Sequence, residues 1–121
     1  MNQLIGKGSF GKVYMVQKMP NNEIFAMKVI KKSMVSSRNQ VAHTKAERDI
    51  MASIKCPFIV DMKYAFQTAE KLYFVMEFLN GGELFHHLRR ERKFSEERAR
   101  FYSAQIIIAL ECLHENDIIY R

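Results

Sequence analysis

Apolar and polar residues alternate along residues 1–30 in a pattern typical of β-strands. Residues 12–17 are rich in alternating β-branched side chains, and residues 24–30 form a second apolar run. Between them lies Met19-Pro20-Asn21-Asn22, whose proline and asparagines are typical of a turn. The pattern therefore predicts two strands joined by a tight connection.

The spacing of apolar residues then changes to that of a helix, over about residues 41–54. Pro57 closes this segment, because the residue before a proline is pushed out of the helical region. Two further strands are predicted over residues 59–66 and 71–77, with a polar connection at residues 67–70.

The second half of the chain has helical patterns. Gly81-Gly82 interrupts the chain, and a short helix is expected over residues 83–90. Ser95 is a good N-cap for a longer helix, which has acidic residues in its first turn, where the helix dipole favours them. Apolar positions recur at helical spacing to about His114, and Asn116 is predicted to end the helix in a left-handed conformation. Strands followed by helices predict an α+β fold.

Composition and charge exclude several classes of protein. The 121 residues are 48% hydrophobic, 26% charged and 12% aromatic, as in one globular domain. No run of about 18 apolar residues is present to span a membrane. Cys56 and Cys112 are too few for a disulfide framework and lack the spacing of a zinc site. The net charge of +6 is concentrated at residues 31–32 and 89–93, with acids interleaved, and is interpreted as a solvated basic face.

These features predict neither a membrane segment nor a nucleic-acid partner. With few cysteines and no charged-then-apolar signal segment at the start, the chain is expected to be intracellular and cytoplasmic, with the nucleus as a second compartment.

A glycine-rich segment, Gly6-Lys7-Gly8-Ser9-Phe10-Gly11, is the first candidate for chemistry. Alone its GxGxxG spacing is a weak signal, and a glycine-rich hairpin without a ligand is the alternative. In a dinucleotide-binding fold the third glycine opens a helix, whereas Gly11 precedes alternating β-branched residues. A Walker A loop is excluded too, because no Gly-Lys-Ser/Thr follows. The remaining nucleotide-binding interpretation is a hairpin whose backbone N–H groups cover phosphates.

Lys28 is the second candidate, because it lies in the apolar strand 24–30. Alternation places Ala26 and Ile30 on the face of Lys28, and both faces of this strand are apolar. A buried ammonium without a partner is unfavourable by several kcal/mol, so an anionic partner is predicted. A lysine that extends from the strand edge to solvent is the alternative.

Glu47 is the predicted partner of Lys28. It shares one face of the predicted helix with three apolar residues, Ile50, Met51 and Ile54. Arg48 and Asp49 fall off this stripe and are expected to face solvent. Packing of the helix on the sheet would bring the carboxylate to the ammonium, which could then be aimed at phosphate oxygens. His43 lies one turn before Glu47, and on physical grounds alone it is a capping or solvated histidine.

These residues together resemble the small lobe of a eukaryotic protein kinase, in which a twisted antiparallel sheet packs with one helix. The shared motifs are the glycine segment with Val13, Ala26-Met27-Lys28 on a strand, and Glu47 on a helix. Further segments resemble the AGC group of serine/threonine kinases, and within it the ribosomal-S6-kinase and protein-kinase-B branch. These segments are residues 43–48, 57–60, 64–68, 81–85 and 94–102.

The resemblance covers nearly the whole chain and implies an ATP site, with Mg²⁺ as the metal. Ile5 and Val13 would sandwich the adenine ring, with Ala26 on its roof. Lys28 would contact the α- and β-phosphates and pair with Glu47. The loop over the phosphates would consist of Gly6, Lys7, Gly8, Ser9, Phe10 and Gly11.

Further positions acquire roles from the resemblance alone. Met76 falls at the gatekeeper position, and Glu77-Phe78-Leu79 would form the hinge that bonds adenine. Glu83 would meet the ribose and, in basic-directed members, a substrate arginine. His43 would sense phosphate on the activation loop. The group also has a small-lobe pocket beside the helix, which receives a C-terminal hydrophobic motif.

The resemblance divides the chain into a small lobe (1–76), a hinge (77–82) and the start of a large lobe (83–121). Tyr120-Arg121 matches the first two residues of the [HY]-R-D catalytic-loop motif, so the catalytic Asp is expected just after Arg121. The Mg²⁺ ligands are likewise expected beyond residue 121. The 121-residue polypeptide is therefore expected to bind ATP weakly and to transfer no phosphate.

For the full kinase, the resemblance implies a protein substrate with basic residues before its Ser or Thr, and an upstream activating kinase. The alternative hypothesis is a short, non-catalytic module that binds nucleotide or a regulator. The transcript beyond the codon for Arg121 distinguishes the two hypotheses.

Overall fold

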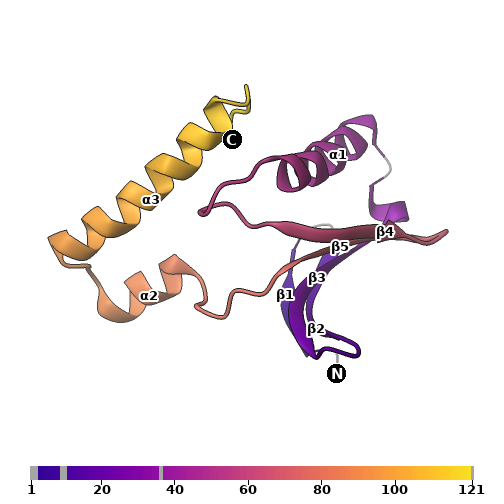
Figure 1. The fold of residues 1–121 in the computed structure, drawn as a ribbon, viewed down its shortest axis with the longest axis horizontal. Coiled ribbons are helices and arrows are strands. Elements are labelled where there is room, and N and C mark those ends of the chain that lie inside the picture. The colour runs from indigo at the N-terminus through magenta and orange to yellow at the C-terminus, as the bar shows by residue number, and fades with distance from the viewer. Residues whose placement is uncertain (1–2, 9–10, 36, 121) are drawn as a thin grey trace. The chain divides into compact units, whose positions relative to one another are not determined.

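The fold is described from a computed structural model, which describes residues 3–8, 11–35 and 37–120. It contains a five-stranded antiparallel sheet, with one α-helix between the third and fourth strands of the chain and further helices after the last strand (Figure 1). The predicted α+β fold is confirmed. The chain forms two compact units, one comprising Met1–Ser53 with Val60–Phe78 and the other Ile54–Ile59 with Leu79–Arg121. The three-part division into 1–76, 77–82 and 83–121 stays a prediction.

The sheet has the strand order β1-β2-β3-β5-β4, so that β3 is its central strand, between β2 and β5. Its strands are β1 (Gln3–Lys7), β2 (Gly11–Lys18), β3 (Glu23–Lys31), β4 (Met62–Gln67) and β5 (Lys71–Glu77). The predicted strands are confirmed, except that β4 begins three residues later than expected. A turn around Pro57 delays it, since the Ile59 N–H donates to the Cys56 carbonyl at 3.1 Å.

The centre of the sheet carries the main hydrophobic core of the first unit. Ile30 on β3 is 2% exposed and clusters with Phe74 on β5 and with Val35. The other face of β3 also has a buried side chain, Phe25, whose ring meets the edge of the Tyr64 ring at 6.0 Å. Each face of β3 therefore carries at least one buried side chain, as its two apolar faces predict.

Helix α1 (Arg38–Ser53) lies along the sheet in Figure 1 and follows a short 3-10 helix, Lys32–Met34. It begins three residues before the predicted start at 41, because Ser37 and Gln40 form a capping box. The Ser37 hydroxyl accepts from the Gln40 N–H at 3.2 Å, and the Gln40 side chain accepts from the Ser37 N–H at 3.3 Å. The pattern Ser-x-x-Gln was the sequence signal for this start.

The second unit contains α2 (Leu84–Glu91) and α3 (Glu96–His114). The start and end predicted for α3 are confirmed, and the Ser95 side chain accepts from the Arg98 N–H. The prediction that Asn116 adopts the left-handed conformation is wrong, because Asp117 does so, with a φ of 58°. Asn116 instead donates through its side chain to the Cys112 carbonyl at 2.8 Å, which holds it against the last turn.

Arg98 joins the end of α2 to the start of α3. Its guanidinium forms an ion pair with Glu91, donates to the Tyr102 hydroxyl at 3.0 Å and stacks over the Phe94 ring at 4.6 Å. The hydrogen bond from Arg98 lowers the pKa of Glu91 below its ordinary value. Among the described residues, no helix has the length and apolar character needed to cross a bilayer.

Candidate nucleotide-binding site

The strand register brings several predicted site residues to one face of the sheet. Val13 on β2 lies opposite Lys28 on β3, and Ala26 lies opposite Met76 on β5. Residues opposite each other in an antiparallel pair share a face, as do residues two apart in a strand. Gly11 joins this face, because it lies opposite Ile30. The face therefore combines small and apolar side chains with a single ammonium.

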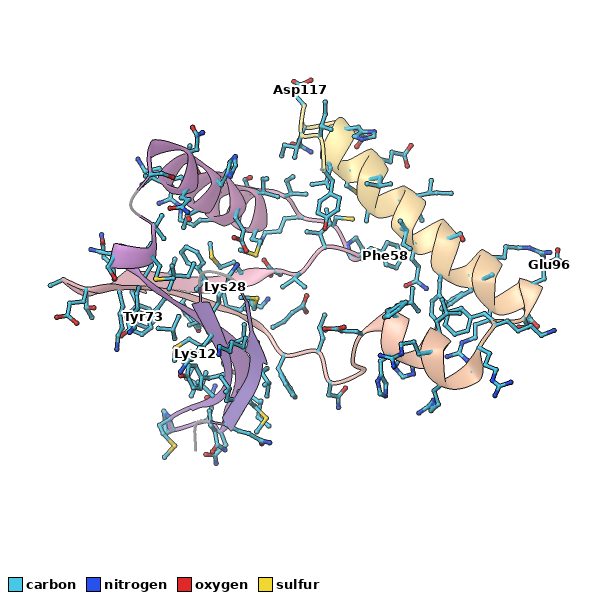
Figure 2. All side chains as sticks on the ribbon, turned by 180° about the vertical axis from the view of Figure 1, so that it is seen from behind. Lys12, Lys28, Phe58, Tyr73, Glu96 and Asp117 are labelled. Atoms are coloured by element: carbon cyan, nitrogen blue, oxygen red, sulfur yellow. The ribbon has the colours of Figure 1, made fainter. Side chains whose placement is uncertain are left out.

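The Lys28 ammonium forms an ion pair with the Glu47 carboxylate of α1, which confirms the predicted partnership. The side chains of Lys28 and Glu47 are 27% and 44% exposed, so the expected buried lysine is instead partly exposed. The methylene groups of Lys28 start from a largely buried strand, while its ammonium extends to Glu47 on α1. Long amphipathic side chains commonly extend in this way. Figure 2 shows Lys28 on β3 below α1. A charge held in this way is aimed and still accessible to a phosphate.

The glycine segment closes a hairpin between β1 and β2. The Gly8 N–H donates to the Gly11 carbonyl at 2.9 Å. Ser9 and Phe10, predicted at the tip of this loop, lie outside the described residues. Gly6 lies opposite Val13, and Lys7 is exposed at the end of β1. The hairpin leads straight into a strand, as the nucleotide-covering interpretation requires.

Gly8 and Gly11 have different structural reasons for being glycine. A Cβ on Gly11 would lie 2.5 Å from the Val29 carbonyl oxygen and 3.1 Å from a side-chain carbon of Ile30. A Cβ on Gly8 would meet only the Gly11 carbonyl oxygen, at 3.9 Å. The packing of β2 on β3 therefore requires glycine at position 11. At position 8 the described residues leave space for a Cβ atom.

This difference predicts opposite outcomes for two alanine substitutions. Gly11→Ala is expected to lower the free energy of unfolding by about 1–3 kcal/mol, because β2 must move away from β3. Gly8→Ala is expected to leave stability within about 0.5 kcal/mol of the parent and to weaken ATP binding through the added methyl group. Urea unfolding and ATP titration of both variants test this. Equal stability losses would contradict the assignment of Gly11 to sheet packing.

The predicted hinge begins at a fixed point at the end of β5. The Glu77 N–H donates to the Asp61 carbonyl at 3.2 Å, and its carboxylate accepts from the Asp61 N–H at 3.1 Å. Sequence reasoning did not identify this clamp, because Asp61 carries no motif. In the second unit, Leu79 is 64% exposed and Glu83 is the N-cap residue of α2. Their adenine and ribose roles stay predictions.

Two other predicted residues are exposed. Ile5 on β1 is 45% exposed, and His43 is exposed on α1. Arg48 and Asp49 were expected to face solvent; they are paired with each other, with side chains 47% and 60% exposed. The roles of Ile5 in adenine contact and of His43 in phosphate sensing stay predictions.

A pocket of about 430 Å³ lies between α1 and β4, within the first unit. Its floor shares Val35, Leu72 and Phe74 with the core, and its walls include three basic residues, Lys32, Lys45 and Arg48. This is the place beside the helix where the resemblance implies a small-lobe pocket. Its chemistry suits apolar side chains accompanied by negative charge.

The donors of the sheet face fit the phosphates of a nucleotide. A held ammonium and the backbone of a glycine hairpin are groups that bind phosphate oxygens. Among the described residues, no cluster of three or more His, Cys, Asp or Glu side chains could hold a metal ion by protein ligands alone. Mg²⁺ usually needs only one or two carboxylates together with substrate phosphates.

Comparison with known proteins agrees with this geometry. The model of the protein kinase domain family matches residues 1–121. The chain is 56% identical over 118 residues to Protein kinase 2 of Dictyostelium discoideum and 52% identical over 119 residues to serine/threonine-protein kinase YPK1 of Saccharomyces cerevisiae. It is also 50% identical over 119 residues to the human RAC-beta serine/threonine-protein kinase. Each alignment covers 98% of this chain but only 18% to 25% of the relative.

Proposed function

Because the chain belongs to the protein kinase domain family, we propose that it is the ATP-binding part of a serine/threonine kinase. Such a kinase would transfer the γ-phosphate of ATP to hydroxyl groups of protein serine or threonine. The observation that carries the proposal is the Lys28–Glu47 ion pair on a sheet face that is shared with Val13, Ala26 and Gly11. The similarity to serine/threonine-protein kinases supports serine and threonine as the residues that are phosphorylated.

In this proposal, the residues of the chain bind and orient the nucleotide. Lys28 contacts the α- and β-phosphates, and Glu47 is a positioning residue that fixes the direction of the ammonium. The N–H groups of the glycine hairpin cover the phosphates, while Val13 and Ala26 offer the apolar surface that adenine stacks on. Mg²⁺ bound together with ATP would supply neutralisation of the phosphate charge.

We also propose that the 121-residue polypeptide itself binds ATP weakly and transfers no phosphate. Phosphoryl transfer depends on positioning together with charge neutralisation by the metal, and the resemblance matches no residue of the 121 to the catalytic Asp or to the Mg²⁺ ligands. Radiolabelled ATP and a basic peptide that contains serine provide the test. The expected result is no labelled peptide, with saturable but weak ATP binding. Robust labelling that Lys28→Met abolishes would overturn the inactivity, and absent ATP binding would favour the regulator-binding module.

The pocket between α1 and β4 supports a docking function. We propose that it receives a hydrophobic C-terminal motif with negative charge, because its floor is apolar and its rim is basic. Lys45→Glu is expected to weaken binding of such a peptide about tenfold at low salt, less so at high salt. Lys12→Glu is the matched control, since Lys12 is exposed on β2 outside the pocket. An equal effect of both variants would contradict docking in this pocket.

The proposal also includes the location of the kinase, its activation and its substrate sequence. An intracellular location, an upstream activating kinase and a basic sequence before the target hydroxyl are supported by the resemblance to the AGC group. Glu83 begins a helix in the second unit and is exposed, as a residue that meets a substrate arginine must be.

A further inference from the structure

The end of β5 is joined to the residue before β4 by two hydrogen bonds of different kinds. Glu77 is the last residue of β5, and Asp61 directly precedes β4. The Glu77 N–H donates to the Asp61 main-chain carbonyl at 3.2 Å. The Asp61 N–H, however, donates to the Glu77 carboxylate at 3.1 Å and not to the Glu77 main-chain carbonyl. The Glu77 side chain therefore occupies a donor that regular pairing gives to its backbone.

Regular antiparallel pairing would join these two main chains twice. In a hydrogen-bonded pair, each residue donates its N–H and accepts through its C=O. The Thr68 N–H donates to the Lys71 carbonyl at 2.9 Å, six residues before Glu77, so the alternation along β5 directs the N–H and C=O of Glu77 toward β4. The carboxylate thus replaces the carbonyl in this pair, which leaves the Glu77 carbonyl outside the ladder.

The Glu77 side chain lies on the sheet face away from the proposed nucleotide. Met76 lies opposite Ala26, whereas Glu77 lies opposite Phe25, and successive residues of a strand alternate between faces. The Glu77 carboxylate is therefore kept apart from the phosphates on the Ala26 face. Its main-chain carbonyl follows Met76 directly, beside the residues that carry adenine in the proposed site.

The side chain and the backbone of Asp61 have separate partners. The Lys63 ammonium donates to Asp61 Oδ2 at 2.6 Å. This bond raises the pKa of Lys63, and the charges of Asp61 and Glu77 add to the rise. A positive charge therefore accompanies the two acidic residues. Because Glu77 contacts only the backbone of Asp61 in the two bonds described above, a change of the Asp61 side chain should leave both bonds intact.

We propose that Glu77 is a positioning residue, whose carboxylate keeps its own main-chain carbonyl available to the amino group of adenine. The inference rests on the proposed function, because it takes ATP as the ligand of this face. A carbonyl accepts but cannot donate, so it favours a purine with an exocyclic amino donor. Without the carboxylate, the Asp61 N–H would bond to the carbonyl, and the amino group would lose its acceptor.

Nuclear magnetic resonance of the nucleotide-free 121-residue chain tests the position of the carbonyl. Scalar couplings across a hydrogen bond connect an amide nitrogen to the carbon of the group that accepts from it. In the parent chain, the Asp61 nitrogen should couple to the side-chain carboxyl carbon of Glu77. In Glu77→Ala, it should couple to the main-chain carbonyl carbon of residue 77. Coupling to that main-chain carbon in the parent chain would overturn the proposal.

Titration with two triphosphates tests the ligand. Purine riboside triphosphate differs from ATP only because it lacks the 6-amino group. The parent chain should bind ATP about three- to tenfold more tightly, which corresponds to one hydrogen bond. Glu77→Ala should abolish this preference by weakening the binding of ATP alone. Glu77→Gln should retain it, since the amide oxygen still accepts from the Asp61 N–H. Asp61→Asn is the matched control and should retain it too.

Two binding results would overturn the positioning role. Glu77→Ala could weaken both triphosphates by the same factor, or Asp61→Asn could lose the preference as Glu77→Ala does. A parent chain that binds neither triphosphate would refute the proposed function and, with it, adenine as the ligand. The couplings, which need no nucleotide, would then still decide whether the Glu77 carboxylate replaces its carbonyl.

Discussion

Lys28→Met is expected to lower kcat by about 10²–10³-fold in a polypeptide that extends this chain through the catalytic Asp and the metal ligands. The ammonium contacts the phosphates in the proposed site, and methionine keeps most of the length of the side chain but removes its charge. Loss of a charged group that acts on the transition state lowers kcat more than it raises KM. Steady-state transfer to a basic peptide measures both quantities.

The same variant should change the stability of the fold little. The Lys28–Glu47 pair is partly exposed, and exposed ion pairs stabilise by at most about 1 kcal/mol. Lys31→Met is the matched control, because Lys31 is an exposed residue of the same strand. It should keep both activity and stability. Full activity of Lys28→Met, or an equal loss in Lys31→Met, would refute the proposed role of the ammonium.

Ile30→Ala is expected to lower the free energy of unfolding by about 2–5 kcal/mol. Ile30 is 2% exposed and lies between Gly11 of β2 and Leu72 of β5, in contact with the Phe74 cluster. Truncation would leave a cavity at the centre of the sheet, where neighbours on both sides are fixed by strand pairing. For a small fold this is a large part of the total stability.

Urea unfolding with Ile24→Ala as the control separates this effect from a general loss of strand propensity. Ile24 is on the same strand but 50% exposed, so its truncation should change stability by no more than about 0.5 kcal/mol. If the two variants unfold at the same urea concentration, the core does not lie at Ile30.

The strands and the Lys28–Glu47 pair were predictable because they rest on short-range patterns. Alternation defined β3 and β5, and a charged residue on each of two apolar faces implied an ion pair between them. The Ser37 and Gln40 capping box also marks the start of α1 in the sequence. Apolar spacing alone does not predict this start, because the first turn of the helix carries polar residues.

Other features depend on which distant segments meet, and no local pattern encodes that. Pro57 indicated a break in the chain but not the turn that delays β4. Asp61, directly before β4, forms two hydrogen bonds with Glu77 at the end of β5, although no motif marks Asp61. The degree of exposure of Lys28 depends on how far α1 covers the sheet.

The central position of β3 has a consequence for the order in which the chain folds. Its pairing with β2 joins neighbouring segments and can form within microseconds, as hairpins do. Its pairing with β5 must first close a long loop, which contains α1 and β4. Glu47 lies inside that loop, so we expect Lys28 to gain its partner only after the slower, long-range step. The hairpin that would cover the phosphates is then in place before the lysine is aimed at them.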